Sequence, residues 1–320
     1  MNLKLNLTMF DMNPNTTETL SSEMKTYYSD YLIDNAKPNL VHDQFGQKLP
    51  IPKGGGKTIN FRRFMPFSKA TQALTEGITP DGGSLSVTNL SSTVSEYGYF
   101  VTLSDVLMLT SIDNTLVETT KLLGNQAGTT LDTITREVLN GGTNVLYAGG
   151  VSARSSITAN TKLTVDDVMK AARFLKTQNA PKIDGAYVAI IHPDVAYDLM
   201  RDEEWIDAHK YSASANLFDG EIGKIGGVRF VESSEAKIFK GSDVNVYSTL
   251  VLGANAYGVT EVEGGGLKNI VKQLGSGGTA DPLNQRATAG WKATKVAERL
   301  VENYMVRIES ASTFDPATNN

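Results

Sequence analysis

The stretch TLVETTKLLGNQAGTTLDTITREVLNG, residues 115–141, has the longest helical periodicity in the sequence. Its apolar and small residues recur at spacings of three and four, which places them on one helix face: Leu116, Thr120, Leu123, Ala127, Leu131, Ile134 and Val138. Thr115 and Glu118 have the spacing of a capping box, and Asn140 with the two glycines after it predicts an end in left-handed backbone. Such a helix would be about 40 Å long. Because Thr and Ala stand on its core face, we expect it to pack against a sheet rather than inside a helical bundle.

Gly124 and Gly128 lie in the middle of this predicted helix. Each glycine costs a helix about 1 kcal/mol relative to alanine. Two interpretations stay open. Either the helix is mildly weakened, or another stretch of backbone crosses it closely at these two positions.

Composition limits the kinds of protein that the chain can be. It has 320 residues, 40% of them hydrophobic and 20% charged, which is enough to bury a core in one large or two modest domains. The net charge of -5 argues against binding of a phosphate backbone by bulk charge. The absence of cysteine excludes disulfides, thiolate metal sites and thiol nucleophiles. No window approaches the ~20 apolar residues of a membrane span, so we expect no membrane partner.

The N-terminal region divides into a polar stretch, residues 1–18, and a predicted helix over 19–37 that Pro38 ends. Tyr27, Tyr28 and Tyr31 lie on the apolar side of this helix. Tyrosine offers a large apolar area with a polar tip and is common at interfaces. Contact with another subunit and an ordinary amphipathic helix are equally consistent with the pattern.

The GGGKT sequence at residues 54–58 looks like a phosphate-binding loop but lacks its context. Ile51 occupies the position where the motif needs its first glycine, and Pro50 and Pro52 interrupt any strand before it. The residues after it, 58–64, alternate with strand period instead of opening a helix. We therefore expect no nucleotide site here.

Residues 57–104 are dominated by strand patterns. One strand is predicted over 57–65 and a second over about 92–103, with some 25 residues between them that include Gly77, Pro80, Gly82 and Gly83. This connection is far longer than a hairpin turn. We expect it to leave the body of the protein and to pack on something else.

The rest of the chain alternates helices and strands without a fixed repeat. Thr164 and Asp167 predict the start of a second helix, which runs to about Gln178. The other predicted elements are a buried strand over 186–191, a short helix over 193–200, and strands within 217–232, 244–252, 257–262 and 291–309.

The sequence offers few residues for catalysis. His192 precedes Pro193 and Asp194 at a strand-to-helix corner and is interpreted as part of a helix cap. Asp202, Glu203 and Glu204 beside Trp205 form either a solvated corner or an acid pair in a pocket. Serine elbows, helical His pairs and dinucleotide loops are missing. We therefore expect an interaction protein without catalytic residues, cofactor or metal.

The chain resembles the major capsid proteins of tailed bacteriophages with the Hong Kong 97 fold, and among them the branch typified by coliphage N-four. The strings that carry the resemblance span most of the chain: LVHDQFGQKLPIPKGGGKTINFRRF (40–64), LTEGITPDGGSLSVTNLSSTVSEYGYFVTLSD (74–105), LGNQAGTTLDTITREVLNGGTNVLYA (123–148), IIHPDVAYDLMRDEEW (190–205), GEIGKIGGVRFVES (220–233) and YMVRIES (304–310).

The resemblance implies an α+β fold with five parts. These are an N-arm over 1–56, an extended β E-loop over 57–104, a peripheral (P) domain over 105–183 with the spine helix at 115–141, an axial (A) domain over 184–285, and a return to the P domain with a C-terminal tail over 286–320. On this interpretation the candidates for subunit contact are Tyr27, Tyr28, Tyr31, Arg62, Arg63, Phe64, Phe67 and Leu74, and Gly124 and Gly128 are close-packing points of the spine.

The resemblance also implies partners. The chain would form hexamers and pentamers that close into an icosahedral shell around double-stranded DNA, without reading its sequence. Since only a few dozen residues precede the matched text, a separate scaffolding protein is implied, along with a portal, and assembly in the host bacterial cytoplasm. Two alternatives stay open: an encapsulin-type shell with a cargo enzyme, and an acid–base hydrolase that uses Asp202, Glu203 or Glu204.

Overall fold

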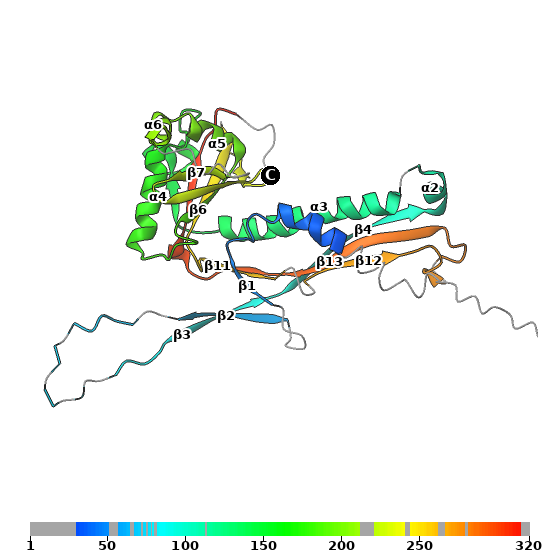
Figure 1. The fold of residues 1–320 in the computed structure, drawn as a ribbon, viewed down its shortest axis with the longest axis horizontal. Coiled ribbons are helices and arrows are strands. Elements are labelled where there is room, and N and C mark those ends of the chain that lie inside the picture. The colour runs from blue at the N-terminus through cyan, green and yellow to red at the C-terminus, as the bar shows by residue number, and fades with distance from the viewer. Residues whose placement is uncertain are drawn as a thin grey trace, which may run out of the picture.

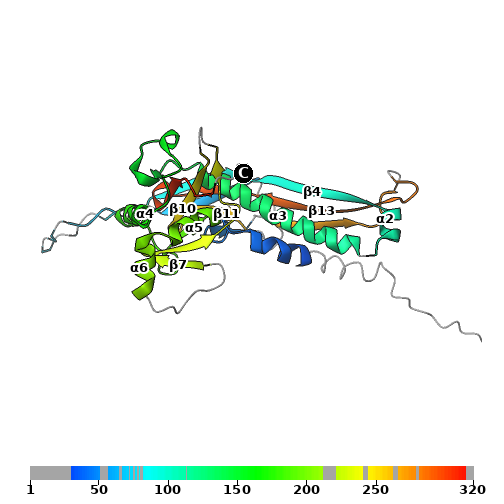
Figure 2. The same cartoon turned by 90° about the horizontal axis from the view of Figure 1, so that it is seen from above.

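The structure is a computed structural model. It describes residues 30–50, 57–64, 82–112, 114–211, 221–240, 244–261, 266–278 and 281–314, and between 65 and 81 it describes residues 67–71, 73, 74, 76, 77 and 79. The molecule is elongated and has three parts: a lobe at one end, a long arm that contains the spine helix, and a β-hairpin that points away from the tip of the arm (Figure 1, Figure 2).

The arm is a helix packed on a three-stranded antiparallel sheet. The elements are α3 (Thr115–Asn140) and the strands in the order β12 (Leu267–Lys272), β13 (Arg286–Lys295) and β4 (Ser95–Ser104), with α2 (Asp105–Thr110) at the tip. Alternate strand residues face α3, and Leu103, Ala289 and Trp291 form one core with Leu123 and Leu131 of the helix. The prediction of a long helix packed on a sheet is confirmed.

The two ends of α3 differ from the prediction. Asn114 is the N-cap, and its side chain accepts the Val117 N–H at 3.4 Å, so Thr115 lies inside the helix. Gly141 has a φ of -74°, which is right-handed backbone, and its N–H donates to the carbonyl of Glu137 at 3.1 Å. A Cβ at Gly141 would lie 2.6 Å from the guanidinium of Arg299, which is the far end of a flexible side chain.

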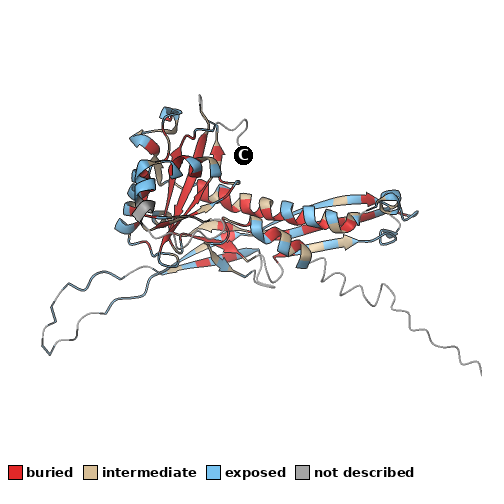
Figure 3. Ribbon diagram, turned by 45° about the horizontal axis from the view of Figure 1, so that its top comes forward, coloured by how far each residue is buried: buried red, intermediate tan, exposed pale blue. Residues whose placement is uncertain are grey.

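The lobe is a seven-stranded mixed sheet with helices on one face. The strand order is β5 (Val145–Tyr147), β15 (Met305–Ser310), β10 (Val246–Leu252), β6 (Tyr187–Ile191), β8 (Val228–Glu232) and β7 (Glu221–Ile225), and β9 (Ile238–Phe239) pairs beside β10. The helices are α4 (Val165–Thr177), α5 (Pro193–Met200) and α6 (Glu203–Tyr211), and short 3-10 turns lie at Lys37–Asn39, Ala148–Gly150, Arg154–Ser156 and Glu302–Tyr304. All five residues of β6 are buried, which confirms the predicted buried strand, and the lobe sheet as a whole is largely buried (Figure 3).

The two faces of the lobe sheet have different neighbours. One face packs in a core with α4 and α5, through residues such as Ala189 and Val168. The other face meets the end of α3, where Ile190 and Leu250 share a core with Leu139. The helix starts predicted at Thr164 and Pro193 are both confirmed, and Thr164 accepts the N–H of Asp167 as its cap.

The sheets do not follow the boundaries expected at residues 184 and 286. Helix α4, expected in the P domain, packs in the lobe core. Strand β12, expected in the A domain, pairs with β13 in the arm, whereas β15, expected in the P domain, pairs with β10 in the lobe. The chain therefore passes between arm and lobe more often than sequence order indicates.

A small sheet lies where arm and lobe meet, with the order β1 (Gln47–Leu49), β11 (Tyr257–Thr260) and β14 (Ala297–Arg299). We call it the junction sheet. The chain that leads into it, residues 30–49, is called the strap: it is helical over 30–36, crosses α3, and ends as β1, parallel to β11. The predicted helix over 19–37 is thus helical in its described part, whereas Tyr27 and Tyr28 lie outside the described residues.

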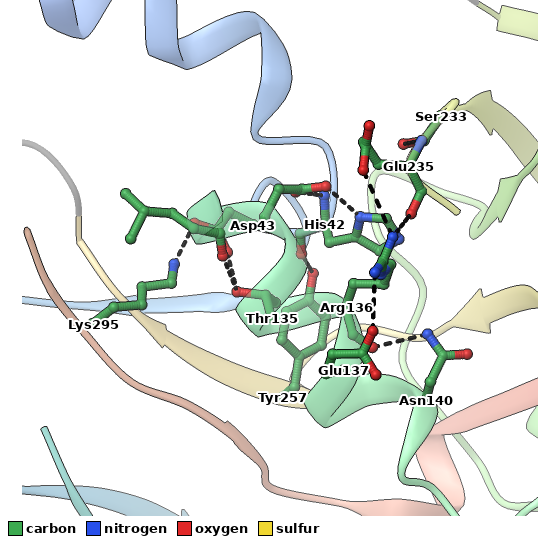
Figure 4. Close-up of polar contacts among 12 residues, drawn as sticks. His42, Asp43, Thr135, Arg136, Glu137, Asn140, Ser233, Glu235, Tyr257 and Lys295 are labelled. Atoms are coloured by element: carbon green, nitrogen blue, oxygen red, sulfur yellow. Dashed lines mark hydrogen bonds and ion pairs between the residues drawn. The ribbon is translucent and has the colours of Figure 1, made fainter. Parts of the chain in front are cut away.

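Buried polar contacts fasten the strap to α3 (Figure 4). The His42 N–H donates to Oδ1 of Asp132, and its ring Nδ1 lies 2.7 Å from Oδ2 of the same carboxylate. Asp43 accepts from the Thr135 hydroxyl at 2.5 Å and forms an ion pair with Lys295 of β13. His42, Asp132 and Lys295 are all buried, so each polar group depends on its partner.

Tyr257 of the junction sheet completes this network by donating its hydroxyl to the carbonyl of His42. Burial raises the pKa of Tyr257 well above its ordinary value, with the carboxylates of Asp43 and Asp132 acting in the same direction. The phenol therefore keeps its proton and remains a donor.

The last turn of α3 is joined to the lobe by a second set of contacts (Figure 4). Arg136 donates to the carbonyl of Glu235 at 2.6 Å and to the carboxylate of Glu137 at 2.9 Å. Asn140 accepts from Ser248 of β10 at 2.5 Å, and Arg307 of β15 donates to its carbonyl. These contacts fix the orientation of the arm relative to the lobe.

The hairpin consists of β2 (Thr58–Phe64) and β3 (Val87–Thr93). The strand predicted over 92–103 is wrong as a single element, because it is divided at Val94. Its first part pairs with β2, and its second part is β4, which pairs with β13 in the arm. Among the described residues, none of the helices is both long and apolar enough to span a bilayer.

Replacing Lys295 by Met tests the strap network. The substitution leaves the buried carboxylate of Asp43 without its cation, and breaking a buried pair in this way typically costs about 3–5 kcal/mol. We expect a loss of that order in the free energy of unfolding, measured with denaturant.

The matched control is Lys292→Met on the same strand. Lys292 is exposed and pairs with Glu96 on the surface, so its loss should cost less than about 1 kcal/mol. Equal effects of the two substitutions would show that the buried pair does not hold the strap.

Candidate assembly surfaces

The far end of the hairpin exposes large apolar side chains. Phe64, Phe67 and Leu74 are 62%, 66% and 77% exposed, and Leu85 and Val87 are also exposed. Phe64, Phe67 and Leu74 are among the contact candidates that the resemblance implies, whereas Leu85 and Val87 are not. Side chains of this size stand on a thin ribbon without a core of their own.

The strand β2 changes character along its length. Ile59 and Phe61 are buried against the body, whereas Arg62 and Phe64 are exposed and Arg63 is partly exposed. The predicted strand alternation is confirmed for this segment. The base of the hairpin is therefore buried against the body, and its far end is exposed. The candidate contact residues Arg62, Arg63 and Phe64 lie at the boundary between these two parts.

The arm sheet carries a groove on the face away from α3, with a volume of about 720 Å³. Phe100 of β4 and Ile270 of β12 flank Gly290, their cross-strand partner, and are 69% and 45% exposed. Lys272 and Lys292 also line the groove. Glu96 and Asp281 line it as well, so the groove has apolar sides and a border with charges of both signs. The sequence analysis missed it, although strand alternation places Phe100 on the opposite face from Leu103.

The tip of the arm is a second exposed apolar region that the sequence analysis missed. Val106, Leu109 and Ile112 of α2 and the residues after it are exposed, and so is Leu283 in the loop before β13. The Asp105 N–H donates to the carbonyl of Gln285, which holds this loop against α2. The sequence feature that indicates this exposed region is the run VLMLTSI at residues 106–112, which is too apolar for a solvent-facing turn.

Gly124 and Gly128 mark the place where the strap crosses α3. A Cβ at Gly124 would lie 2.8 Å from the carbonyl oxygen of Leu32, and a Cβ at Gly128 would overlap the carbonyl oxygen of Ala36. These distances support the second interpretation of the two glycines, in which another stretch of backbone crosses the helix closely. The third N-terminal tyrosine, Tyr31, lies in the strap and is half-buried.

A family model described as phage capsid protein matches residues 88–304, which is more than half of the chain. The chain belongs to the phage capsid protein family. The match includes most of the arm and lobe but begins within β3 of the hairpin. A search among curated proteins finds no match.

Solved capsid structures have the same fold at low sequence identity. The capsid of cyanophage P-SCSP1u matches with a TM-score of 0.64 at 15% identity, covering 85% of this chain and 88% of that one. The capsid of Ralstonia phage GP4 matches with a TM-score of 0.64 at 14% identity, covering 83% and 86%. A chain in the head structure of Helicobacter pylori bacteriophage KHP40 matches with a TM-score of 0.62 at 10% identity, covering 85% of this chain and 88% of that one. The predicted α+β fold of the Hong Kong 97 type is confirmed.

Two of the candidate acid–base residues of this capsid protein, Asp202 and His192, cap helix starts. Asp202 accepts the N–H of Val165 at 3.0 Å through one oxygen and that of Glu204 at 3.1 Å through the other, so it caps two helix starts. Glu203 and Glu204 are exposed. His192 accepts the N–H of Asp194 at 3.2 Å, which is the helix cap that the sequence predicted. In the described part of the chain, no group of three or more acidic or histidine side chains could hold a metal ion.

The C-terminal segment of the capsid protein is latched to α5 through Asp198. One oxygen of this carboxylate accepts from the Ser312 hydroxyl at 2.8 Å and from the Thr313 N–H at 2.7 Å. The other oxygen accepts from the Thr313 hydroxyl, and Lys162 lies 3.6 Å away. Burial alone would raise the pKa of Asp198, but these hydrogen bonds and Lys162 outweigh it and lower the pKa below its usual value.

Gly128→Ala tests the crossing of strap and α3. At an unobstructed helix position this change should stabilise by about 1 kcal/mol. Here the added Cβ meets backbone that cannot rotate away, so we expect a loss of about 1–3 kcal/mol in the free energy of unfolding.

Asn125→Ala on the exposed side of α3 is the control and should be neutral or slightly stabilising. A more stable Gly128→Ala protein would rule out a close crossing.

Asp198→Asn tests the C-terminal latch through its pH dependence. Because the folded-state pKa is lowered, the stability that Asp198 contributes is present above its unfolded pKa of about 3.9 and is lost as the pH falls through the folded value. The stability difference between wild type and variant should therefore be constant from neutral pH to about pH 5 and shrink below about pH 4.

Denaturant unfolding at a series of pH values measures this difference. The control is Asp166→Asn, whose exposed ion pair with Lys170 should give little difference at any pH. A difference for Asp198→Asn that persists undiminished at pH 2 would contradict the latch.

Proposed function

We propose that this protein is the major capsid protein of a tailed double-stranded DNA phage and that it assembles as hexamers and pentamers into an icosahedral shell. The observation that carries the proposal is the presence of two exposed apolar surfaces on one subunit of a capsid family. One is the exposed apolar end of the hairpin, and the other is the apolar groove on the arm sheet.

Within this proposal the hairpin is the E-loop, the arm is the P domain and the lobe is the A domain. The E-loop then comprises residues 57–93, since β4 pairs within the arm. The hairpin of one subunit lies across the arm of its neighbour, where Phe64, Phe67 and Leu74 bury their side chains near Phe100 and Ile270. Burial of an apolar side chain of this size is worth roughly 1.5–3 kcal/mol, so a few such contacts per subunit accumulate to a stable shell.

The remaining partners follow from the same proposal. A separate scaffolding protein and a portal take part in assembly, which proceeds in the host bacterial cytoplasm, and the shell encloses DNA without base-specific contacts. The strings quoted above support a place in the branch typified by coliphage N-four.

Electron microscopy and light scattering of the purified protein, with and without its scaffold, test the proposal directly. Shells that contain long double-stranded DNA when isolated from infected cells would support it. Shells filled with a cargo enzyme instead would favour a nanocompartment, and a monomer under all conditions would refute self-assembly.

Replacing residues 66–86 by an Asn-Gly turn separates folding from assembly. The strands β2 and β3 keep their pairing and their seat on the body, so circular dichroism and the melting temperature should change little. Sedimentation should show loss of shells or fragile shells, because the apolar contact with the neighbour is removed.

Two results would overturn this role for the hairpin. Unfolding of the shortened subunit would place the segment in the core. Normal shells with unchanged heat resistance would place the main contact elsewhere.

A further inference from the structure

The base of the hairpin rests on one face of the junction sheet. Gln47, Gly258 and Glu298 are cross-strand partners in β1, β11 and β14, so their side-chain positions point to the same face. The hairpin lies against this face. The opposite face is occupied by Tyr257, which reaches the strap.

Phe61 of β2 lies directly on the backbone of Gly258. A Cβ at Gly258 would overlap the Phe61 ring, and Phe61 is only 1% exposed. Gly258 does not have the left-handed backbone that demands glycine. Glycine is therefore required at this position for space: it forms a notch in the sheet that receives the aromatic ring.

A polar contact fixes the second strand of the hairpin. Ser92 of β3 donates its hydroxyl to Oε2 of Glu298 at 2.8 Å. Ser92 is the cross-strand partner of Ile59, and Leu90 is the partner of Phe61. Both strands are thus attached to the junction sheet, one through an apolar contact and one through a hydrogen bond, within the first few residues of the hairpin.

Beyond this base, the residues that the structure describes between Phe64 on one strand and Val87 on the other are exposed. Each strand residue adds about 3.3 Å of length. A small tilt at Phe61 therefore becomes a displacement of several ångströms at the free end, where contact with a neighbour would be made.

We propose that Gly258 is a positioning residue for assembly, because the notch that it forms for Phe61 sets the direction in which the hairpin leaves the subunit. This inference rests on the proposed function of the hairpin as a contact with a second copy of the chain. Gly258 itself touches no neighbour. It acts through Phe61, and Ser92 with Glu298 prevents the hairpin from rotating about that contact.

The direction of the hairpin can be measured in unassembled subunits. The chain has no cysteine, so Ser84→Cys toward the free end of the hairpin and Lys268→Cys on the arm provide two exposed, unique sites for spin labels. Pulsed electron spin resonance then gives the distance distribution between hairpin and arm. Gly258→Ala should shift this distribution by several ångströms while circular dichroism stays unchanged, and sedimentation should show loss of most shells.

Rescue by a second substitution distinguishes direction from general damage. Phe61→Leu removes the outer ring atoms that meet the new Cβ, so Phe61→Leu with Gly258→Ala should restore both the wild-type distance and shell formation toward the level of Phe61→Leu alone. If Gly258→Ala fails to fold, Phe61→Leu by itself remains informative: it leaves the notch partly empty and should broaden the distance distribution and reduce the yield of shells.

Three results would overturn the proposal: an unchanged distance distribution in folded Gly258→Ala, normal shell formation despite a shifted hairpin, or Phe61→Leu with wild-type distance and assembly. Failure of the proposed function is recognised separately, because the wild-type protein would then form no shells whatever the direction of its hairpin.

Discussion

The backbone of the strap lies directly on α3, and the place of the junction sheet and its hairpin relative to the arm depends on this crossing. Gly124 and Gly128 remove the side chains that would hold the two segments apart. The strap can then bring His42 and Asp43 to α3 and continue as β1 of the junction sheet. That sheet carries the hairpin on its other face. One close approach between two pieces of backbone thus relates the arm, the lobe and the hairpin.

The subunit buries charged side chains in paired contacts and exposes apolar side chains on its surface. In the interior, charged groups have close partners: Asp43 contacts Thr135 and Lys295, and Glu309 is held by Arg154 and Arg307. Such networks are specific in geometry, because a misplaced partner leaves a buried charge uncompensated. On the surface, the hairpin end, the groove and the tip of the arm expose apolar side chains. A well-packed interior combined with exposed apolar surfaces suits a protein whose subunits cover these surfaces with further copies of the same chain.

Sequence patterns predicted the elements better than their arrangement. The helix α3, the capped helix α4, the buried strand β6 and the short helix at Pro193 follow from local periodicity and capping residues, which act within a few positions. The division of residues 87–104 at Val94 was missed, because both halves have strand character and only their partners differ. The contact between His42 and Asp132 joins residues 90 positions apart, and no local pattern marks it. The groove was missed for the same reason, since it needs three strands from two distant segments.

The parallel pairing of β1 with β11 determines how the subunit bears mechanical load. A force along the axis of β1 loads the registers from Gln47 with Gly258 to Leu49 with Thr260 together, in shear. Hydrogen bonds that share a load in this way resist more than bonds that open one after another. The load must also draw His42 and Asp43 out of their buried pairs. The strap is therefore a tension anchor, placed where the two large parts of the subunit meet.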